Sequence, residues 1–125
     1  MPPSRANGLV YTEEDRRGVN FGFFDTTVHT GDLLFASLLK WQAAQELLQL
    51  LDDPNRAAPY RRDLATIAEA IGTIFVREDG WLRASTGTSS QPDVWGTALA
   101  VCLGVLHRSE EHTSELQARQ SISYA

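Results

Sequence analysis

The sequence predicts an all-α fold built from helical hairpins. Three segments, residues 32–51, 59–76 and 92–106, carry apolar residues at the three- and four-residue spacing of an α-helix. Short polar turns containing Asp, Pro and Gly separate these segments. Two of the three are apolar around almost their whole circumference, which indicates helices that lie inside a larger helical layer.

The first predicted helix covers residues 32–51. Its main apolar stripe consists of Leu34, Leu38, Trp41 and Leu48. Other apolar residues flank this stripe, and Lys, Gln and Glu interrupt them at only a few positions. A side-chain oxygen of Thr30 or Asp32 is expected to accept a hydrogen bond from the free amides of the first turn. The pattern therefore predicts a capped helix that is buried on most sides.

The second predicted helix covers residues 59–76 and follows a turn at residues 52–55. Pro59 fits its first turn, where a missing N–H leaves no hydrogen bond unmade. A single apolar stripe is formed by Leu64, Ile67, Ala68, Ile71, Ile74 and Phe75. Charged and polar residues occupy the other side, which predicts a helix with one buried face and one solvated face.

The third predicted helix covers residues 92–106. A turn at residues 77–80, a short extended stretch at 81–84 and a Gly/Ser/Thr loop at 85–90 precede it. Asp93 in its first turn suits the helix dipole. The helix has almost no polar face, and its Cys102 is expected to be a small buried core residue.

An amphipathic helix between two nearly apolar helices is the pattern expected of an (α/α) toroid, in which an outer ring of helices covers an inner ring. Three helices cannot cover one another completely, since two of them need neighbours on every side. We therefore expect residues 21–107 to form a partial slice of such a ring. Residues 1–20 are polar and are predicted to be irregular.

The last eighteen residues, 108–125, resemble one reading frame of a sequencing adapter, with two constant blocks at the expected spacing. The first block is RSEEHTSELQ and the second is ISYA. We expect this tail to be non-native and exclude it from the predicted domain.

Composition limits the function further. The chain has 11 basic and 16 acidic residues, a net charge of −5, which is not the basic footprint of a nucleic-acid-binding domain. One cysteine allows neither a disulfide framework nor a Cys-x-x-Cys metal site. No apolar run reaches the roughly 20 residues of a membrane span, and no secretory signal is visible. A cytoplasmic protein without a cofactor or metal is expected, and its oligomeric state stays open.

Two segments resemble bacterial six-hairpin glycosidase-like proteins, which are related in fold to glycogen-debranching-type glucosidases. The first, residues 21–41, begins FGFFDTTVHTGD, and the second, residues 80–101, contains QPDVWGT, the most specific run. The resemblance implies an (α/α)6 toroid and a glycoside hydrolase that acts on a glucan or an oligosaccharide. That fold needs twelve helices, so we expect this three-helix chain to be a fragment that is inactive alone. The family's catalytic funnel lies at the N-terminal ends of the inner helices, which here corresponds to residues 21–32 and 85–95.

Glycoside hydrolysis usually needs two carboxylates that flank the scissile bond. Asp25 and Asp93 are the candidates, with Asp32 a weaker one. Aromatic neighbours of Asp25 favour a proton donor, because a desolvated carboxyl has a raised pKa. Each has a structural alternative: Asp25 can brace its loop, and Asp32 and Asp93 can be first-turn helix residues.

The candidate substrate-binding residues are Trp95, Gln91, His29, Phe24 and Trp81. Aromatic faces suit the apolar C–H face of a pyranose, although core packing is the more common role of such residues. Gln91 and His29 can hydrogen-bond sugar hydroxyls or can organise their loops. Two alternative functions stay open: a non-catalytic helical protein-interaction module, and a lyase or epimerase on the same fold.

Overall fold

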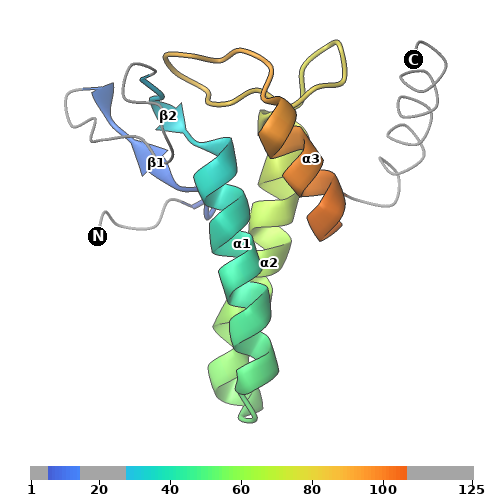
Figure 1. Ribbon diagram of the computed structural model, residues 1–125. Coiled ribbons are helices and arrows are strands. Elements are labelled where there is room, and N and C mark those ends of the chain that lie inside the picture. Colours follow the sequence, from blue (N-terminus) through green and yellow to red (C-terminus); the bar gives the residue numbers. More distant parts are fainter. Residues whose placement is uncertain (1–5, 15–27, 107–125) are drawn as a thin grey trace, which may run out of the picture.

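The protein is mostly helical, as predicted. The computed structural model describes residues 6–14 and 28–106. Their elements are strands β1 (Tyr11–Thr12) and β2 (Gly31–Asp32) and helices α1 (Leu34–Leu50), α2 (Pro54–Ile74) and α3 (Val94–Leu103). α1 and α2 lie side by side as a long hairpin, and α3 packs beside α1 near the end at which the loops gather (Figure 1).

Helix α1 has nearly the predicted bounds, but its start differs from the prediction. Leu33 is the N-cap residue, and no side chain caps the helix. The Leu34 amide instead donates to the carbonyl oxygen of Ala84 at 3.0 Å, and the Leu33 amide donates to that of Val10 at 2.9 Å. The predicted cap at Thr30 or Asp32 is therefore wrong, because main-chain acceptors from two distant segments already satisfy these amides.

Helix α2 starts five residues before the predicted position. Asp53 caps it by accepting a hydrogen bond from the Asn55 amide at 2.9 Å, and Pro54 occupies the first turn. The predicted turn at residues 52–55 therefore includes the true helix start, and Pro59 lies inside the helix instead of at its beginning. Asp53-Pro54 and Pro59 are both sequence signals for the start of a helix. The helix begins at the first of them, where Asp53 supplies a capping hydrogen bond.

Helix α3 is shorter than predicted at its C-terminal end. Gly104 terminates it in the left-handed conformation, with φ of +69°. The Gly104 amide donates to the carbonyl oxygens of Ala100 and Val101, and the Val105 amide donates to that of Ala100 at 3.2 Å. This arrangement satisfies the last carbonyls of the helix and turns the chain back, so that Val105 is buried.

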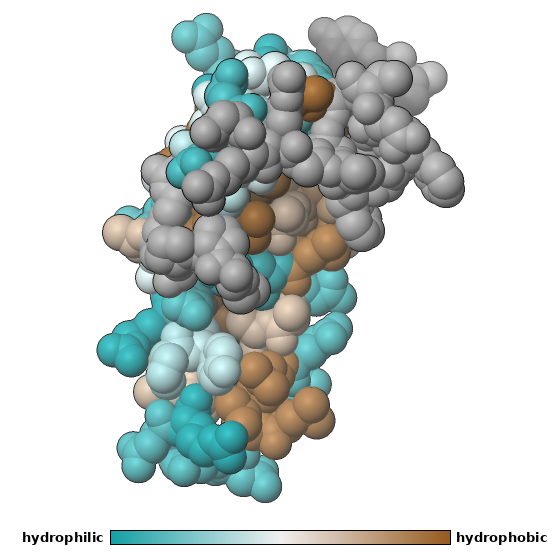
Figure 2. All heavy atoms as spheres, turned by 90° about the vertical axis from the view of Figure 1, so that its left-hand side faces the viewer, coloured by the Kyte–Doolittle hydropathy of each residue, from teal (hydrophilic) through white to brown (hydrophobic). Residues whose placement is uncertain are grey.

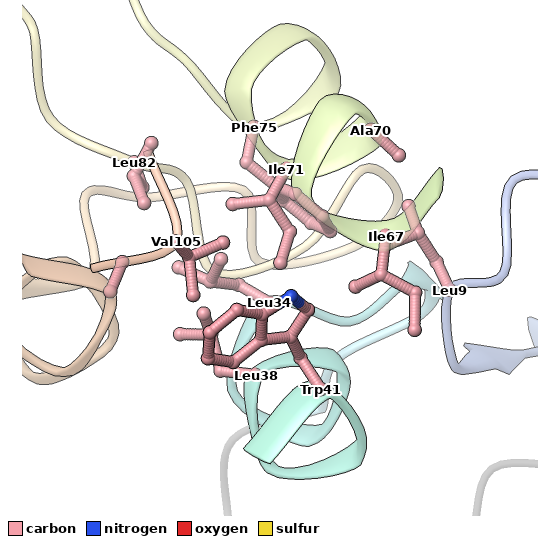
Figure 3. Packing of buried hydrophobic residues seen from close by; sticks show 11 residues of the cluster. Leu9, Leu34, Leu38, Trp41, Ile67, Ala70, Ile71, Phe75, Leu82 and Val105 are labelled. Carbon is pink, nitrogen blue, oxygen red and sulfur yellow. The ribbon is translucent and has the colours of Figure 1, made fainter. Parts of the chain in front are cut away.

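The core lies between α1 and α2, with α3 and the N-terminal segment closing its sides (Figure 3). It is formed by Leu34, Leu38 and Trp41 of α1, Ile67, Ala70, Ile71 and Phe75 at α2, and Leu9, Leu82, Ala100 and Val105. The indole N–H of Trp41 donates to the Leu64 carbonyl oxygen at 3.1 Å, which satisfies the one polar atom of this side chain. The predicted stripe of the second helix is confirmed, because Ile67 and Ile71 are completely buried.

A small antiparallel sheet, which the sequence pattern does not predict, joins the N-terminal segment to the start of α1. Tyr11 lies opposite Asp32, and Thr12 lies opposite Gly31. Two side chains of α1 hold the same segment: the Ser37 hydroxyl accepts from the Val10 amide at 3.0 Å, and Lys40 Nζ donates to the Gly8 carbonyl at 2.7 Å. These contacts fix part of a segment that was expected to be irregular.

The burial predicted for the two apolar helices holds on one side only. On α3, Val94 is 58% exposed and Val101 is 59% exposed, and Cys102 is exposed as well. The prediction of a buried Cys102 is therefore wrong, because α3 packs through its Gly96 and Ala100 face and Cys102 lies on the other side. Apolar side chains also reach the surface on the side of α1, where Leu50 is 79% exposed (Figure 2).

None of the helices in residues 6–14 and 28–106 combines the length and the apolar character that crossing a membrane requires.

Candidate functional site

The loops before α1 and α3 lie against each other at one end of the helical hairpin (Figure 1). The Gly87 amide donates to the Thr30 carbonyl at 2.8 Å, and the Thr86 amide donates to the Asp32 carbonyl at 3.1 Å. The Thr86 hydroxyl accepts in return from the Asp32 amide at 2.9 Å. We call residues 28–33 and 85–93 the loop cluster. It contains the described part of the two loops in which sequence analysis places the site.

Two glycines allow the loops to approach this closely. A Cβ on Gly31 would lie 2.5 Å from the Thr86 hydroxyl oxygen and 2.8 Å from the Gly87 nitrogen. A Cβ on Gly87 would lie 2.7 Å from the Thr30 carbonyl oxygen. Gly31 also has a φ of +82°, which other residues rarely adopt. Larger side chains at these positions would force the loops apart.

A carboxylate from the N-terminal segment joins both loops. Glu14 Oε1 accepts hydrogen bonds from the Thr88 hydroxyl at 2.6 Å and from the Thr30 hydroxyl at 3.0 Å. The Thr30 hydroxyl also accepts from the Thr88 amide at 2.7 Å. Sequence reasoning missed Glu14, since it lies 74 residues from Thr88 in a segment predicted to be irregular, and no local pattern marks it.

The turn at residues 77–80 adds a third part to this end of the molecule. The Arg77 amide donates to the Trp81 carbonyl at 2.9 Å, and Gly80 has a φ of +87°, so the predicted turn is confirmed. Arg77 Nη1 donates to the Ser90 carbonyl of the loop cluster at 3.3 Å. The Arg77 guanidinium also hydrogen-bonds the exposed carboxylate of Asp79 at 3.2 Å and lowers the pKa of this carboxyl below its ordinary value.

The candidate carboxylates have different surroundings. Asp93 caps α3, because its Oδ1 accepts a hydrogen bond from the Gly96 amide at 2.8 Å. Asp32 is buried at 5% exposure in β2, where its main chain pairs with Tyr11 and Thr86, so it is not the first-turn helix residue that was expected. Asp25 lies outside the described residues.

Three of the candidate substrate-binding residues are exposed near the loop cluster. Trp95, in the first turn of α3, is 69% exposed, and Trp81 is 40% exposed. The Gln91 side chain is exposed, while its main-chain carbonyl accepts from the Ala84 amide at 2.9 Å. Phe24 lies outside the described residues. Gln91, Asp93 and Trp95 therefore all lie at the N-terminal end of α3, and Trp81 directly follows the turn at residues 77–80.

Two basic side chains hold a nitrogen that is buried and makes no hydrogen bond within the described part of the chain. His29, half-buried beside Thr30, has such an atom in Nε2, and Arg83 has one in Nε. A buried polar atom without a partner is unfavourable, and contact with a ligand is one way in which such an atom is satisfied. His29 was predicted as a site residue, whereas Arg83 was not.

Among residues 6–14 and 28–106, no three His, Cys, Asp or Glu side chains gather in a way that could hold a metal ion. The described part of this end of the protein offers carboxylate, amide and imidazole groups for hydrogen bonding and, on the same end, exposed indole rings.

Comparison of the chain with protein-family models, with curated proteins and with solved structures finds no match.

Proposed function

We propose that this chain is part of a carbohydrate-active enzyme, a glycoside hydrolase that acts on a glucan or an oligosaccharide, and that its helices are a slice of an (α/α)6 toroid. The observation that carries the proposal is the loop cluster at the N-terminal ends of α1 and α3, with Gln91, Asp93 and Trp95 at one helix start. The resembled family builds its catalytic funnel at the corresponding place.

The surfaces of the two apolar helices support the same proposal. Both α1 and α3 keep apolar side chains exposed, among them Leu39, Leu50, Val94 and Val101. α2 instead exposes a charged face, which includes Arg61, Arg62 and Asp63. Further helices beside α1 and α3 would remove this apolar surface from water, as the inner ring of a toroid requires.

The roles follow from the chemistry of each side chain. The indole ring of Trp95 stacks on the apolar face of a sugar ring, and Gln91 and His29 hydrogen-bond its hydroxyls. Trp81 and Phe24 extend the aromatic surface. Asp25 and Asp93 are the proposed carboxylates, and Asp93 acts through the oxygen that does not cap α3.

Binding of soluble glucans in native affinity gels tests the site. We expect the chain to be retarded by at least one glucan, and Trp95→Ala to lose this retardation. Leu50→Ala is the matched control, since Leu50 is 79% exposed and lies at the end of α1 that is farther from the loop cluster. The length of α1, about 25 Å, separates the two ends. Equal mobility of the chain in every glucan gel, or equal loss in both variants, would contradict the proposed site.

Hydrolysis tests the fragment part of the proposal. Because catalysis needs both carboxylates in a complete funnel, the chain alone should release no sugar from α-glucosides above the blank rate. A measurable rate that is lost in Asp93→Asn would show that this chain holds a complete active site.

A specific observation also favours the alternative, a non-catalytic helical protein-interaction module: all exposed side chains of α3 are apolar. Thermal melting by circular dichroism, with light scattering at low micromolar concentration, separates the two. A module should melt cooperatively as a monomer, whereas a toroid slice should melt broadly or aggregate.

A further inference from the structure

The guanidinium group of Arg83 has no partner in residues 6–14 and 28–106. Its Nε atom is buried and makes no hydrogen bond, and no ion pair joins its side chain to another group of this part of the chain. A guanidinium always carries a positive charge and offers five donors, so a half-buried one without an acceptor is unfavourable. An anionic ligand would satisfy these donors.

The extended stretch that precedes the loop cluster places Arg83 beside an aromatic ring. Alternate side chains of extended chain point to opposite faces. Leu82 and Ala84 are buried, at 2% and 6% exposure, whereas Trp81 is 40% exposed. Arg83 forms a β-bridge with Pro92, whose side chain is exposed as well. Trp81, Arg83 and Pro92 therefore share the outer face of this stretch.

The carboxylates that the fold brings nearest to this stretch are already engaged. Asp93 follows Pro92, and its main-chain amide donates to the carbonyl oxygen of the buried Leu82 at 2.8 Å. Its Oδ1 caps α3. Asp79 forms an ion pair with Arg77 at 3.2 Å. Neither carboxylate neutralises Arg83, so this charge is left for a ligand.

We propose that the sugar chain bound at this end of the protein is acidic, and that Arg83 binds the carboxylate of a uronic acid residue whose ring stacks on Trp81. The inference rests on the proposed function, which assigns Trp81 to the sugar-binding surface, and it narrows the substrate to an acidic oligosaccharide. Two residues of extended chain separate Trp81 from Arg83 by about 7 Å. A pyranose ring can therefore lie on the indole while its carboxylate reaches the guanidinium, which pairs with carboxylates through two parallel hydrogen bonds.

The charge of the whole chain does not attract such a ligand. The net charge is −5, which repels polyanions in general. The half-buried position of Arg83 strengthens its own attraction, because a hydrogen bond is electrostatically stronger in a partly desolvated site than in water. A preference for an acidic sugar would therefore come from this guanidinium.

Isothermal titration calorimetry of the full chain tests the inference with two matched probes. One is a malto-oligosaccharide, and the other is the same oligosaccharide after oxidation of its primary hydroxyls to carboxylates. The oxidised probe should bind at least about tenfold more tightly. Arg83→Gln should remove this preference, and Arg83→Lys should keep only part of it, since an ammonium group lacks the planar fork. Arg61→Gln removes the same charge at an exposed position of α2 and should leave the preference unchanged.

The outcomes separate this inference from the proposed function. No binding of the oxidised probe, equal affinity for both probes, or a preference that Arg83→Gln leaves intact would overturn the inference. Retardation of the chain by a glucan in the affinity gels, lost in Trp95→Ala, would in each case still support the proposed carbohydrate site. If no glucan retards the chain and neither probe binds, both proposals are wrong.

Urea unfolding tests whether Arg83 has a structural role instead. Arg83→Met keeps the aliphatic stem and removes the nitrogen that is buried without a partner. Its urea midpoint should equal or exceed that of the parent chain, because no hydrogen bond is lost. A lower midpoint would show that the guanidinium stabilises the fold through a protein contact, and would overturn the inference.

Discussion

Gly96 is a position at which α3 lies close against α1, and Gly96→Ala tests this packing. A Cβ at this residue would lie 2.6 Å from Cδ2 of Leu34 and 2.5 Å from Oδ2 of Asp93. Leu34 is completely buried in the core, and Asp93 is held by its capping hydrogen bond, so neither can move freely. The added methyl group must therefore push α3 away from α1 or disrupt its cap.

Gly96→Ala has one stabilising and two destabilising effects, and their magnitudes decide whether the free energy of unfolding rises or falls. Alanine is a better helix former than glycine by about 1 kcal/mol, which alone would stabilise α3. Overpacking a buried contact costs about 1–3 kcal/mol, and losing the capping hydrogen bond costs about 1 kcal/mol more. We therefore expect Gly96→Ala to lower the free energy of unfolding by about 1–3 kcal/mol.

Urea unfolding followed by circular dichroism measures this change. Ala98→Gly, at an exposed position of the same helix, is the control for helix propensity and should cost about 1 kcal/mol without any packing term. A Gly96→Ala variant with a higher urea midpoint than the parent chain would refute the close packing of α3 on Leu34.

Three other predictions follow from single hydrogen bonds. Asp93→Ala should destabilise the chain by about 1 kcal/mol and Asp93→Asn by much less, since only Asn keeps a capping oxygen; urea midpoints that fall equally in both would contradict this. Glu14→Ala should speed hydrogen exchange of the Thr88 amide, whose acceptor, the Thr30 hydroxyl, would lose its link to Glu14; unchanged exchange would show that the loops hold without it. The pKa of Asp79 is lowered in the folded chain, so the stabilisation from its pair with Arg77 is present above about pH 4 and is lost as the pH falls further. In an NMR titration, Arg77→Gln should raise the pKa of Asp79 towards its ordinary value, because the hydrogen bond from Arg77 is the largest cause of the lowering; an equal Asp79 pKa in the variant and the parent chain would contradict this.

The sequence predicts the helices well because their signals are local. Ile67 and Ile71 follow the helical period, and both are completely buried. The turn before Trp81 was also predicted, since its Gly80 supplies a positive φ. The errors lie at boundaries, where two signals of similar strength compete. Asp53 and Pro59 both predict a start for α2, and periodicity alone cannot choose between them.

The candidate site is only partly readable from sequence. Gln91, Asp93 and Trp95 are close in sequence, so one loop and the helix that follows it bring them to one helix start. No local sequence pattern identifies Glu14 or Arg83, and the sequence analysis predicted neither of them as a site residue. The predicted Asp25 and Phe24 lie outside the described residues.

By itself, the sequence determined three helices, two of them nearly apolar and one amphipathic, the polar turns between them and the approximate position of the loops, because hydrophobic period and turn residues act within a few positions along the chain. Only the tertiary structure decided which face of each helix is covered, and it left Cys102 exposed. It also decided the pairing of β1 with β2 and the joining of two loops by Glu14. Such contacts depend on where distant segments meet in space, and their energy comes from neighbours that no local pattern identifies.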